Sequence, residues 1–364
     1  MNPRLILFSA PLLLCLALPA QGVVSPRHFA GAEGHSYSTN VNAHIGSTST
    51  PARYLQVHDD MAGNGRTINS IAFRRDGLYT TSNFASYSIV IDLFLSTATT
   101  TAGALDTTFD NNHGADKTRV AVFQMVQFPA TTHGDLPHPF LYKIPFSTPF
   151  IFGGKGPLCW EVLVQSRQNT SIIYHDSAIS TGANPALRIA TSGSGCKSSG
   201  NTSAISYSAS STMNWTTGSG TLSLSGSRYP KSSAALITIG ISNKSYGGVP
   251  LPFEIPSSKG ASSGTCYLYC DMLLAMVAFT TSSGGLSSVL AVPATVAVHG
   301  FTVYTQALAP DPAANPIGLA TSPLLLFNFC YPDTLPTVGA LSLGGSTGAT
   351  GTAYANRGLI ARFE

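Results

Sequence analysis

The segment Asp110–Asp116 (DNNHGAD) has the densest group of oxygen-bearing side chains that could bind a metal ion. Asp110, Asn112 and Asp116 lie around a glycine in a polar loop, and calcium prefers carboxylate and amide oxygens as ligands. The segment lacks the residue order of an EF-hand and its bidentate glutamate. Asp and Asn also favour turns, so a simple turn is the alternative to this candidate calcium site.

Two histidines form a second candidate metal site. His133 and His138 stand on either side of Asp135 in a polar loop, where they could converge on a cation. No third ligand follows at a fixed spacing, and the sequence contains no H-E-x-x-H motif. Two exposed loop histidines are therefore the alternative.

Hydrolytic chemistry would need a nucleophile with a base, or two carboxylates close together. The run Gly260–Gly264 (GASSG) has the G-x-S-x-G spacing, but we expect it to be a flexible loop and expect no such elbow after a strand. Most of the 16 acidic residues lie in turns. Asp92 and Glu161 lie within strands and could form a glycosidase pair. Strand alternation places each on a polar face, which favours two solvated residues. The sequence therefore predicts no catalytic residues and no cofactor other than the candidate calcium.

Aromatic side chains could form a sugar-binding face. Trp160 alternates with Val162 and is expected in the core. Trp215, which lies among Ser and Thr, is the better candidate for an exposed ring that contacts a ligand. Tyr269 and Tyr304 could add surface contacts, but one tryptophan does not make a binding platform.

Short strands with a two-residue period would position these residues. In Ser86–Ser96 (SYSIVIDLFLS), alternate residues from Tyr87 to Leu95 line one apolar face. No segment shows a sustained helical period. The other strands expected in the first half are Arg53–His58, Thr67–Arg74, Arg119–Phe128, Pro139–Pro145, Leu158–Gln165, Ser171–Tyr174 and Ala186–Ala190.

The composition shifts at Thr191–Gly220, which is nearly all Ser, Gly, Thr and Asn and which we interpret as a domain boundary. Asp271–Thr280 could form a helical turn or a strand. The other strands expected in the second half are Thr221–Ser225, Ala235–Ser242, Cys266–Tyr269, Ser287–Val292, Gly300–Leu308, Ser322–Phe329 and Arg357–Phe363. Many short strands separated by turns predict an all-β fold. We expect two antiparallel, jelly-roll-like β-sandwich domains in tandem, residues 23–190 and 191–364, the second with a Gly/Ser/Thr-rich tail.

The composition indicates a folded protein. Hydrophobic residues make up 43% of the 364 residues and charged residues only 10%, the reverse of the balance in disordered chains. A low charge suits an extracellular β-protein whose surface is Ser, Thr, Asn and Gly. The net charge of +3, with no basic run longer than Arg74-Arg75, argues against a nucleic-acid partner.

The N-terminus predicts export. Arg4 precedes the apolar run Leu5–Leu18, and Ala20-Gln21-Gly22 offers small residues for cleavage, which together are typical of a secretory signal peptide over residues 1–22. A membrane anchor is the alternative, but the run is short and no stop-transfer flank follows. We expect a secreted protein, extracellular or periplasmic, without a membrane span after cleavage.

Export changes how the cysteines are interpreted, because disulfides form in oxidising compartments. Five cysteines follow the expected signal peptide, so one is free or pairs elsewhere: Cys159, Cys196, Cys266, Cys270 and Cys330. Within one strand, Cys266 and Cys270 would be too far apart to form a bond.

Several segments resemble a known group of proteins. Gly-Ser-Gly-Cys at 193–196, CYLYCD at 266–271 and GFTVYTQALAPDP at 300–312 follow one another as in a C-terminal β-domain. That domain belongs to uncharacterised secreted β-rich proteins of planctomycete-type bacteria. In the first half, RYLQVHD at 53–59 and INSIAFRRDG at 68–77 are also similar to such proteins. The resemblance implies export, a β fold, a pairing of Cys196 with Cys266, and a framework role for Tyr304 and Gln306. It implies no particular activity.

These observations favour a secreted, non-catalytic β-sandwich protein with a structural or adhesive role at the cell surface. Its partners would be polysaccharide or other cell-surface components. A carbohydrate-binding module is the first alternative, and a secreted hydrolase is the second. A flat polar surface would favour the adhesive role, an aromatic strip the module, and a charged pocket the hydrolase.

Overall fold

The computed structural model describes residues 22–34, 36–37, 51–78, 82–134, 136–168, 172–179, 187–256, 265–331, 337–355 and 357–364. Nearly all of the predicted signal peptide lies outside them. Strands account for 54% of the structure, which confirms the all-β fold class. The helices described are short 3-10 turns, none of them able to cross a membrane: η1 (Arg27–Ala30), η2 (Asp59–Met61), η3 (Phe109–Asn112) and η4 (Val296–Val298).

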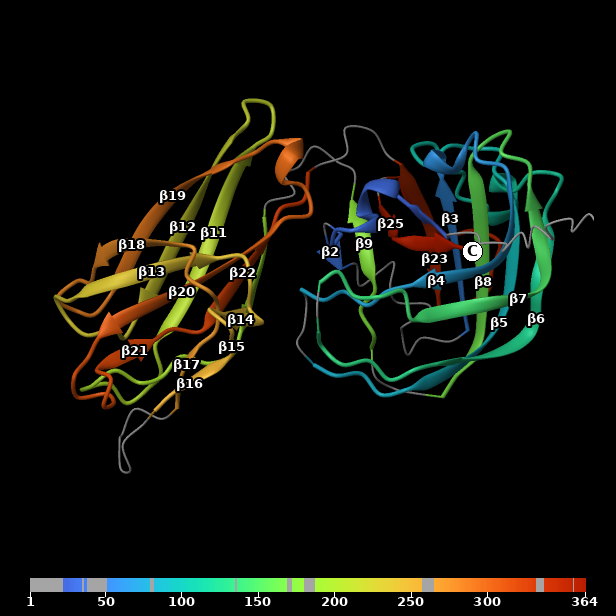
Figure 1. Cartoon of the computed structure of the whole chain (residues 1–364). Helices are drawn as coiled ribbons and strands as arrows, with labels where there is room; N and C mark the ends of the chain where they lie inside the picture. Colours follow the sequence, from blue (N-terminus) through green and yellow to red (C-terminus); the bar gives the residue numbers. More distant parts are fainter. Residues whose placement is uncertain are drawn as a thin grey trace, which may run out of the picture.

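The first sandwich packs a six-stranded sheet against a four-stranded one (Figure 1). The larger sheet has the order β24-β23-β3-β8-β5-β6 and consists of β3 (Ala52–His58), β5 (Tyr87–Thr97), β6 (Thr118–Phe128), β8 (Leu158–Arg167), β23 (Val338–Gly344) and β24 (Thr352–Tyr354). The smaller has the order β1-β26-β4-β7 and consists of β1 (Val23–Ser25), β4 (Arg66–Phe73), β7 (Tyr142–Phe152) and β26 (Ala361–Phe363). A short sheet beside them contains β2 (Ser36–Tyr37), β9 (Asp176–Ile179) and β25 (Arg357–Leu359).

Alternation along these strands builds the core of the first sandwich. Ile89, Ile91 and Leu93 of β5 are fully buried between the sheets with Trp160 of β8, as their spacing predicts. The outer face of the larger sheet is also covered, because the β5–β6 connection places Phe109 over it. This double burial explains why every residue of β3 is buried.

The second sandwich has a six-stranded sheet and a three-stranded sheet (Figure 1). The first has the order β10-β22-β20-β13-β18, with β21 beside β20, and consists of β10 (Arg188–Ser192), β13 (Ala234–Gly240), β18 (Leu274–Phe279), β20 (Thr302–Pro310), β21 (Leu319–Thr321) and β22 (Leu324–Asn328). The second consists of β11 (Ser206–Asn214), β12 (Ser219–Ser227) and β19 (Leu286–Pro293). Two small pairs complete the body: β14 (Ser245–Tyr246) with β15 (Val249–Pro250), and β16 (Phe253–Ile255) with β17 (Cys266–Leu268).

The assignment of residues 191–364 to one tandem domain is wrong at the C-terminal end. β23 pairs with β3 over seven residue pairs, and β26 lies between β1 and β4. Leu341 and Phe363 are fully buried there, so the last strands complete both sheets of the first sandwich. The Gly/Ser/Thr-rich tail therefore contains framework strands, and the second sandwich lies between two parts of the first in the sequence.

The boundary region also holds strands that the composition concealed. β11 lies wholly within Thr191–Gly220, and β10 already belongs to the second sandwich. The ambiguous Asp271–Thr280 contains the strand β18. The described residues of the predicted strand Ser171–Tyr174 form no strand. In β11 the inward residues alternate with serines, so its hydrophobic pattern is weak.

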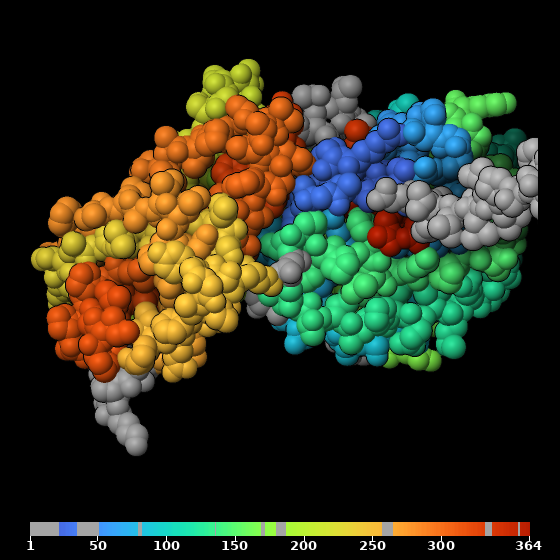
Figure 2. Space-filling view, viewed as in Figure 1, coloured from blue at the N-terminus to red at the C-terminus, as the bar shows by residue number. Residues whose placement is uncertain are grey.

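The two sandwiches lie against each other (Figure 2), and the junction between them has polar and apolar parts. Arg188 of β10 donates two hydrogen bonds to Asp76, which follows β4, at 2.8 and 3.0 Å. Beside this pair, Leu78 and Leu136 of the first sandwich pack with Leu324 of the second. Because these contacts are buried, they hold the segment after β4 and the strands β10 and β22 in a defined position at the junction.

Candidate functional site

One face of the second sandwich is covered with short uncharged polar side chains. The outward residues of β11 and β12 are Ser206, Ser208, Ser210, Thr212, Asn214, Ser219, Thr221, Ser223, Ser225 and Ser227, and nearly all of them are exposed. The inward residues between them, such as Tyr207 and Leu224, are buried in the core. We call these ten outward residues the hydroxyl face.

Antiparallel pairing gives the hydroxyl face a regular order. Ser208 lies opposite Ser225, and Ser210 lies opposite Ser223. The hydroxyls of Ser208 and Ser225 are 3.0 Å apart, so some of them hold one another in place. β19 extends the face with Ser287 and with apolar residues that include Val289, which is 63% exposed. The whole face carries no charged side chain.

The candidate calcium residues do not share a site. Asp110 accepts hydrogen bonds from Lys117 at 2.8 Å and Arg53 at 3.1 Å, so protein cations already neutralise it. Asn112 is buried and uses its amide to brace its own loop. Asp116 accepts from the Thr97 N–H and hydroxyl. These contacts within the protein fit the turn that is the alternative to a calcium site. Among the described residues, no group of three or more His, Cys, Asp or Glu could hold a metal ion.

Asp92 and Glu161 lie on the same face of the larger sheet of the first sandwich. Asp92 of β5 is opposite Leu163 of β8, and Glu161 lies two residues before Leu163 on the same strand, so its side chain points to the same side. Burial acts to raise the pKa of Glu161, but hydrogen bonds from His113 and Arg53 outweigh it and lower that pKa. Burial also acts to raise the pKa of Asp92, but hydrogen bonds from Arg119 and from the Phe123 N–H outweigh it and lower that pKa. Neither carboxyl is therefore suited to be the general acid of a glycosidase.

The structure reveals two Ser–His contacts that the sequence does not indicate. The Trp160 indole donates to Nε2 of His58 at 2.9 Å, so Nδ1 carries the proton and donates to Ser25 Oγ at 2.7 Å. His58 therefore cannot take a proton from Ser25. Ser96 contacts His113 Nδ1 at 2.8 Å, but Ser96 is fully buried and out of reach of a substrate.

The aromatic candidates are mainly structural. Trp215 is half-buried in the turn between β11 and β12, and its ring lies 5.3 Å from that of Tyr331. The expectation of an exposed Trp215 is therefore wrong. Tyr304 packs at the junction, and Tyr269 bonds to the backbone of Ser194. Gln306 is fully buried and donates to the carbonyls of Tyr267 and Ser322.

The disulfide implied by the resemblance is present between Cys196 and Cys266. It connects the segment after β10 to the start of β17. Cys159, Cys270 and Cys330 are buried free thiols, and burial raises the pKa of each. A raised pKa keeps them protonated and unreactive at neutral pH.

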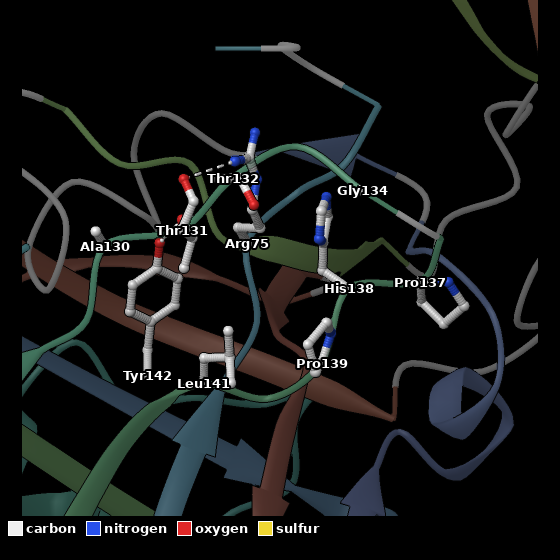
Figure 3. A pocket seen from close by; sticks show the side chains of 10 residues that line it. All are labelled: Arg75, Ala130, Thr131, Thr132, Gly134, Pro137, His138, Pro139, Leu141 and Tyr142. Carbon is white, nitrogen blue, oxygen red and sulfur yellow. Dashed lines mark hydrogen bonds between the residues drawn. The ribbon is translucent and has the colours of Figure 1, made fainter. Parts of the chain in front are cut away.

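His133 and His138 lie side by side, with ring centroids 5.8 Å apart, while Asp135 is outside the described residues. His138 lines a cavity in the connection between β6 and β7 (Figure 3).

Comparisons of this chain with protein-family models and with curated proteins found no match.

Proposed function

We propose that the protein is an exported, non-catalytic adhesive protein that attaches to neutral polysaccharide through the hydroxyl face. The predicted signal peptide and the resemblance to secreted β-rich proteins support export. The observation that carries the proposal is the uncharged, ordered array of hydroxyls on β11 and β12.

The chemistry of the hydroxyl face suits a solid carbohydrate surface. Adjacent strands lie roughly 4.8 Å apart, and same-face residues repeat about every 6.8 Å, so the hydroxyls form a regular two-dimensional array. A neutral polysaccharide also presents regularly spaced hydroxyls that donate and accept hydrogen bonds. Serine and threonine lose little side-chain entropy on binding. Val289 on the neighbouring strand adds apolar contact for the C–H groups of sugar rings.

Adsorption to insoluble cellulose and chitin tests this proposal. The variant Ser210→Glu/Ser223→Lys places a charge pair across two directly opposed strand positions, which preserves the hairpin. We expect the bound fraction to fall at least fivefold, because long charged side chains must be desolvated at the surface. The matched control Thr67→Glu/Ile151→Lys changes a directly opposed pair on β4 and β7 and should bind like the wild type. Failure of the wild type to adsorb, or equal adsorption of both variants, would contradict the proposal.

A further inference from the structure

An apolar pocket of about 290 Å³ enters the core of the second sandwich between its two sheets. Strands of both sheets line it: β12 and β19 belong to the three-stranded sheet, and β13, β18, β20 and β22 belong to the six-stranded one (Figure 1). The turn η4 adds Val298 to the wall. All twelve lining residues are Leu, Ile, Val, Ala, Pro or Phe.

Two large apolar side chains mark the mouth of this pocket. Leu274, at the start of β18, is 64% exposed, and Phe301, just before β20, is 50% exposed, although both line the pocket. Leu222 and Phe327 also line it, and both are buried in the core of the second sandwich. The pocket therefore leads from exposed apolar side chains into the core, and exposed apolar surface beside an opening is typical of a binding site.

The lining selects against polar ligands. A polar group inside the pocket would lose its hydrogen bonds to water and would find no side-chain partner in exchange. A peptide strand would bury N–H and C=O groups there, and a sugar ring would bury its hydroxyls. None of the six strands that line the pocket contains a charged residue, so no side chain of these strands could pair with a buried ionic group.

The size of the pocket suits a hydrocarbon chain. A cavity of about 150 Å³ lined by Leu, Ile and Phe stays dry and takes up benzene, which has six carbon atoms. In proportion, a pocket of about 290 Å³ holds roughly ten carbon atoms. Because the mouth is open, a polar head group can stay in water while the chain lies between the sheets.

We propose that this pocket binds one alkyl chain of a single-chain amphiphile, with the polar head group outside. Leu274 and Phe301 then contact the part of the chain nearest the head group. The pocket lies on the inward side of the sheet whose outward side carries the hydroxyl face. The inference therefore does not depend on adhesion through that face.

Isothermal titration calorimetry of the full mature chain with hexan-1-ol, heptan-1-ol and octan-1-ol tests the proposal. Affinity should rise about fourfold with each added carbon, because each methylene moves from water into an apolar site. Octane-1,8-diol should bind at least tenfold more weakly than octan-1-ol, because its second hydroxyl would be buried without a partner.

Two pairs of variants locate the binding site. Val292→Trp fills the pocket from β19, and its control is Val289→Trp, an identical change on the same strand at a residue that faces outward and is 63% exposed. Leu274→Ser removes apolar contact at the exposed mouth, where folding does not depend on it. Its control is Leu273→Ser, at a neighbouring residue that is 62% exposed and does not line the pocket.

We expect affinity for octan-1-ol to fall at least tenfold in Val292→Trp and at least threefold in Leu274→Ser, with both controls like the wild type. The hydroxyl-face variant Ser210→Glu/Ser223→Lys should also bind octan-1-ol like the wild type, and a loss there would place the ligand on the hydroxyl face instead. The proposal would be overturned by that loss, by no saturable binding of octan-1-ol, by equal affinity for the diol, or by undiminished binding to folded Leu274→Ser.

Discussion

Replacing Arg188 by methionine tests whether the ion pair at the junction stabilises both sandwiches. Arg188 donates to both carboxylate oxygens of Asp76 and to the carbonyl of Gly34, at 2.8 to 3.1 Å. Asp76 has a fully buried side chain. Methionine retains much of the apolar length of arginine, so the substitution removes the charge and the hydrogen bonds with little loss of packing.

The expected loss of stability follows from the buried charge that remains. Removing one partner of a buried ion pair typically costs about 3–5 kcal/mol, because the other charge loses its compensation. The Leu78 N–H still donates to Asp76 at 2.9 Å, which favours the lower end of that range. We therefore expect the free energy of unfolding to fall by about 3 kcal/mol. The double variant Asp76→Asn/Arg188→Met should recover at least half of this loss.

Urea unfolding of the full chain, followed by tryptophan fluorescence, measures the loss. Trp160 lies in the core of the first sandwich and Trp215 packs against that of the second, so single-tryptophan variants report on each sandwich separately. Arg357→Met, at an exposed position of β25, is the control. A loss below about 1 kcal/mol in Arg188→Met, or no recovery in the double variant, would refute the reasoning.

Three further changes test other parts of the structure. Replacing Cys196 and Cys266 by alanine opens a loop of 70 residues and should lower the stability reported by Trp215 by about 4 kcal/mol in urea unfolding; a change below 1 kcal/mol would contradict this. Burial lowers the pKa of His175 to about 3 in the folded chain. As the pH falls below 6.5, this histidine therefore binds a proton in the unfolded chain while it stays neutral in the folded chain. Stability should then fall by about 1.4 kcal/mol per pH unit from this residue, and unfolding at pH 7, 5.5 and 4.5 should show a shallower decline in His175→Phe. Burial and neighbouring carboxylates raise the pKa of Glu33 in the folded chain. The folded state therefore loses stability as the pH rises above the pKa that Glu33 has in the unfolded chain. Glu33→Gln should therefore raise the melting temperature at pH 8 but not at pH 4, and an equal effect at both pH values would count against a raised pKa of Glu33.

The sequence by itself determined most of the local structure. A strand needs only alternating apolar residues and a turn at each end, and β5, β8 and β20 show that pattern within their own residues. The low charge and the many Ser and Thr residues indicated an uncharged polar surface. The resemblance implied the Cys196–Cys266 pairing that the structure contains.

Tertiary structure alone decided which strands belong together. β23 pairs with β3 across nearly the whole chain, and Gly339 and Gly344 made its sequence look like a loop. Strand pairing depends on packing between distant segments, which a local period cannot encode. Only this packing shows that the last strands return to the first sandwich.

The hydroxyl face and the cavity lined by His138 depend on the sequence to different degrees. The hydroxyl face follows from local alternation of serine with apolar residues once β11 is known to be a strand. In the cavity, by contrast, Arg75 and His138 are separated by more than sixty residues and meet only because β4 pairs with β7. Burial in the folded chain raises the pKa of Glu33 and lowers that of His175. Charge states of this kind depend on the folded environment, so the amino-acid types alone could not predict them.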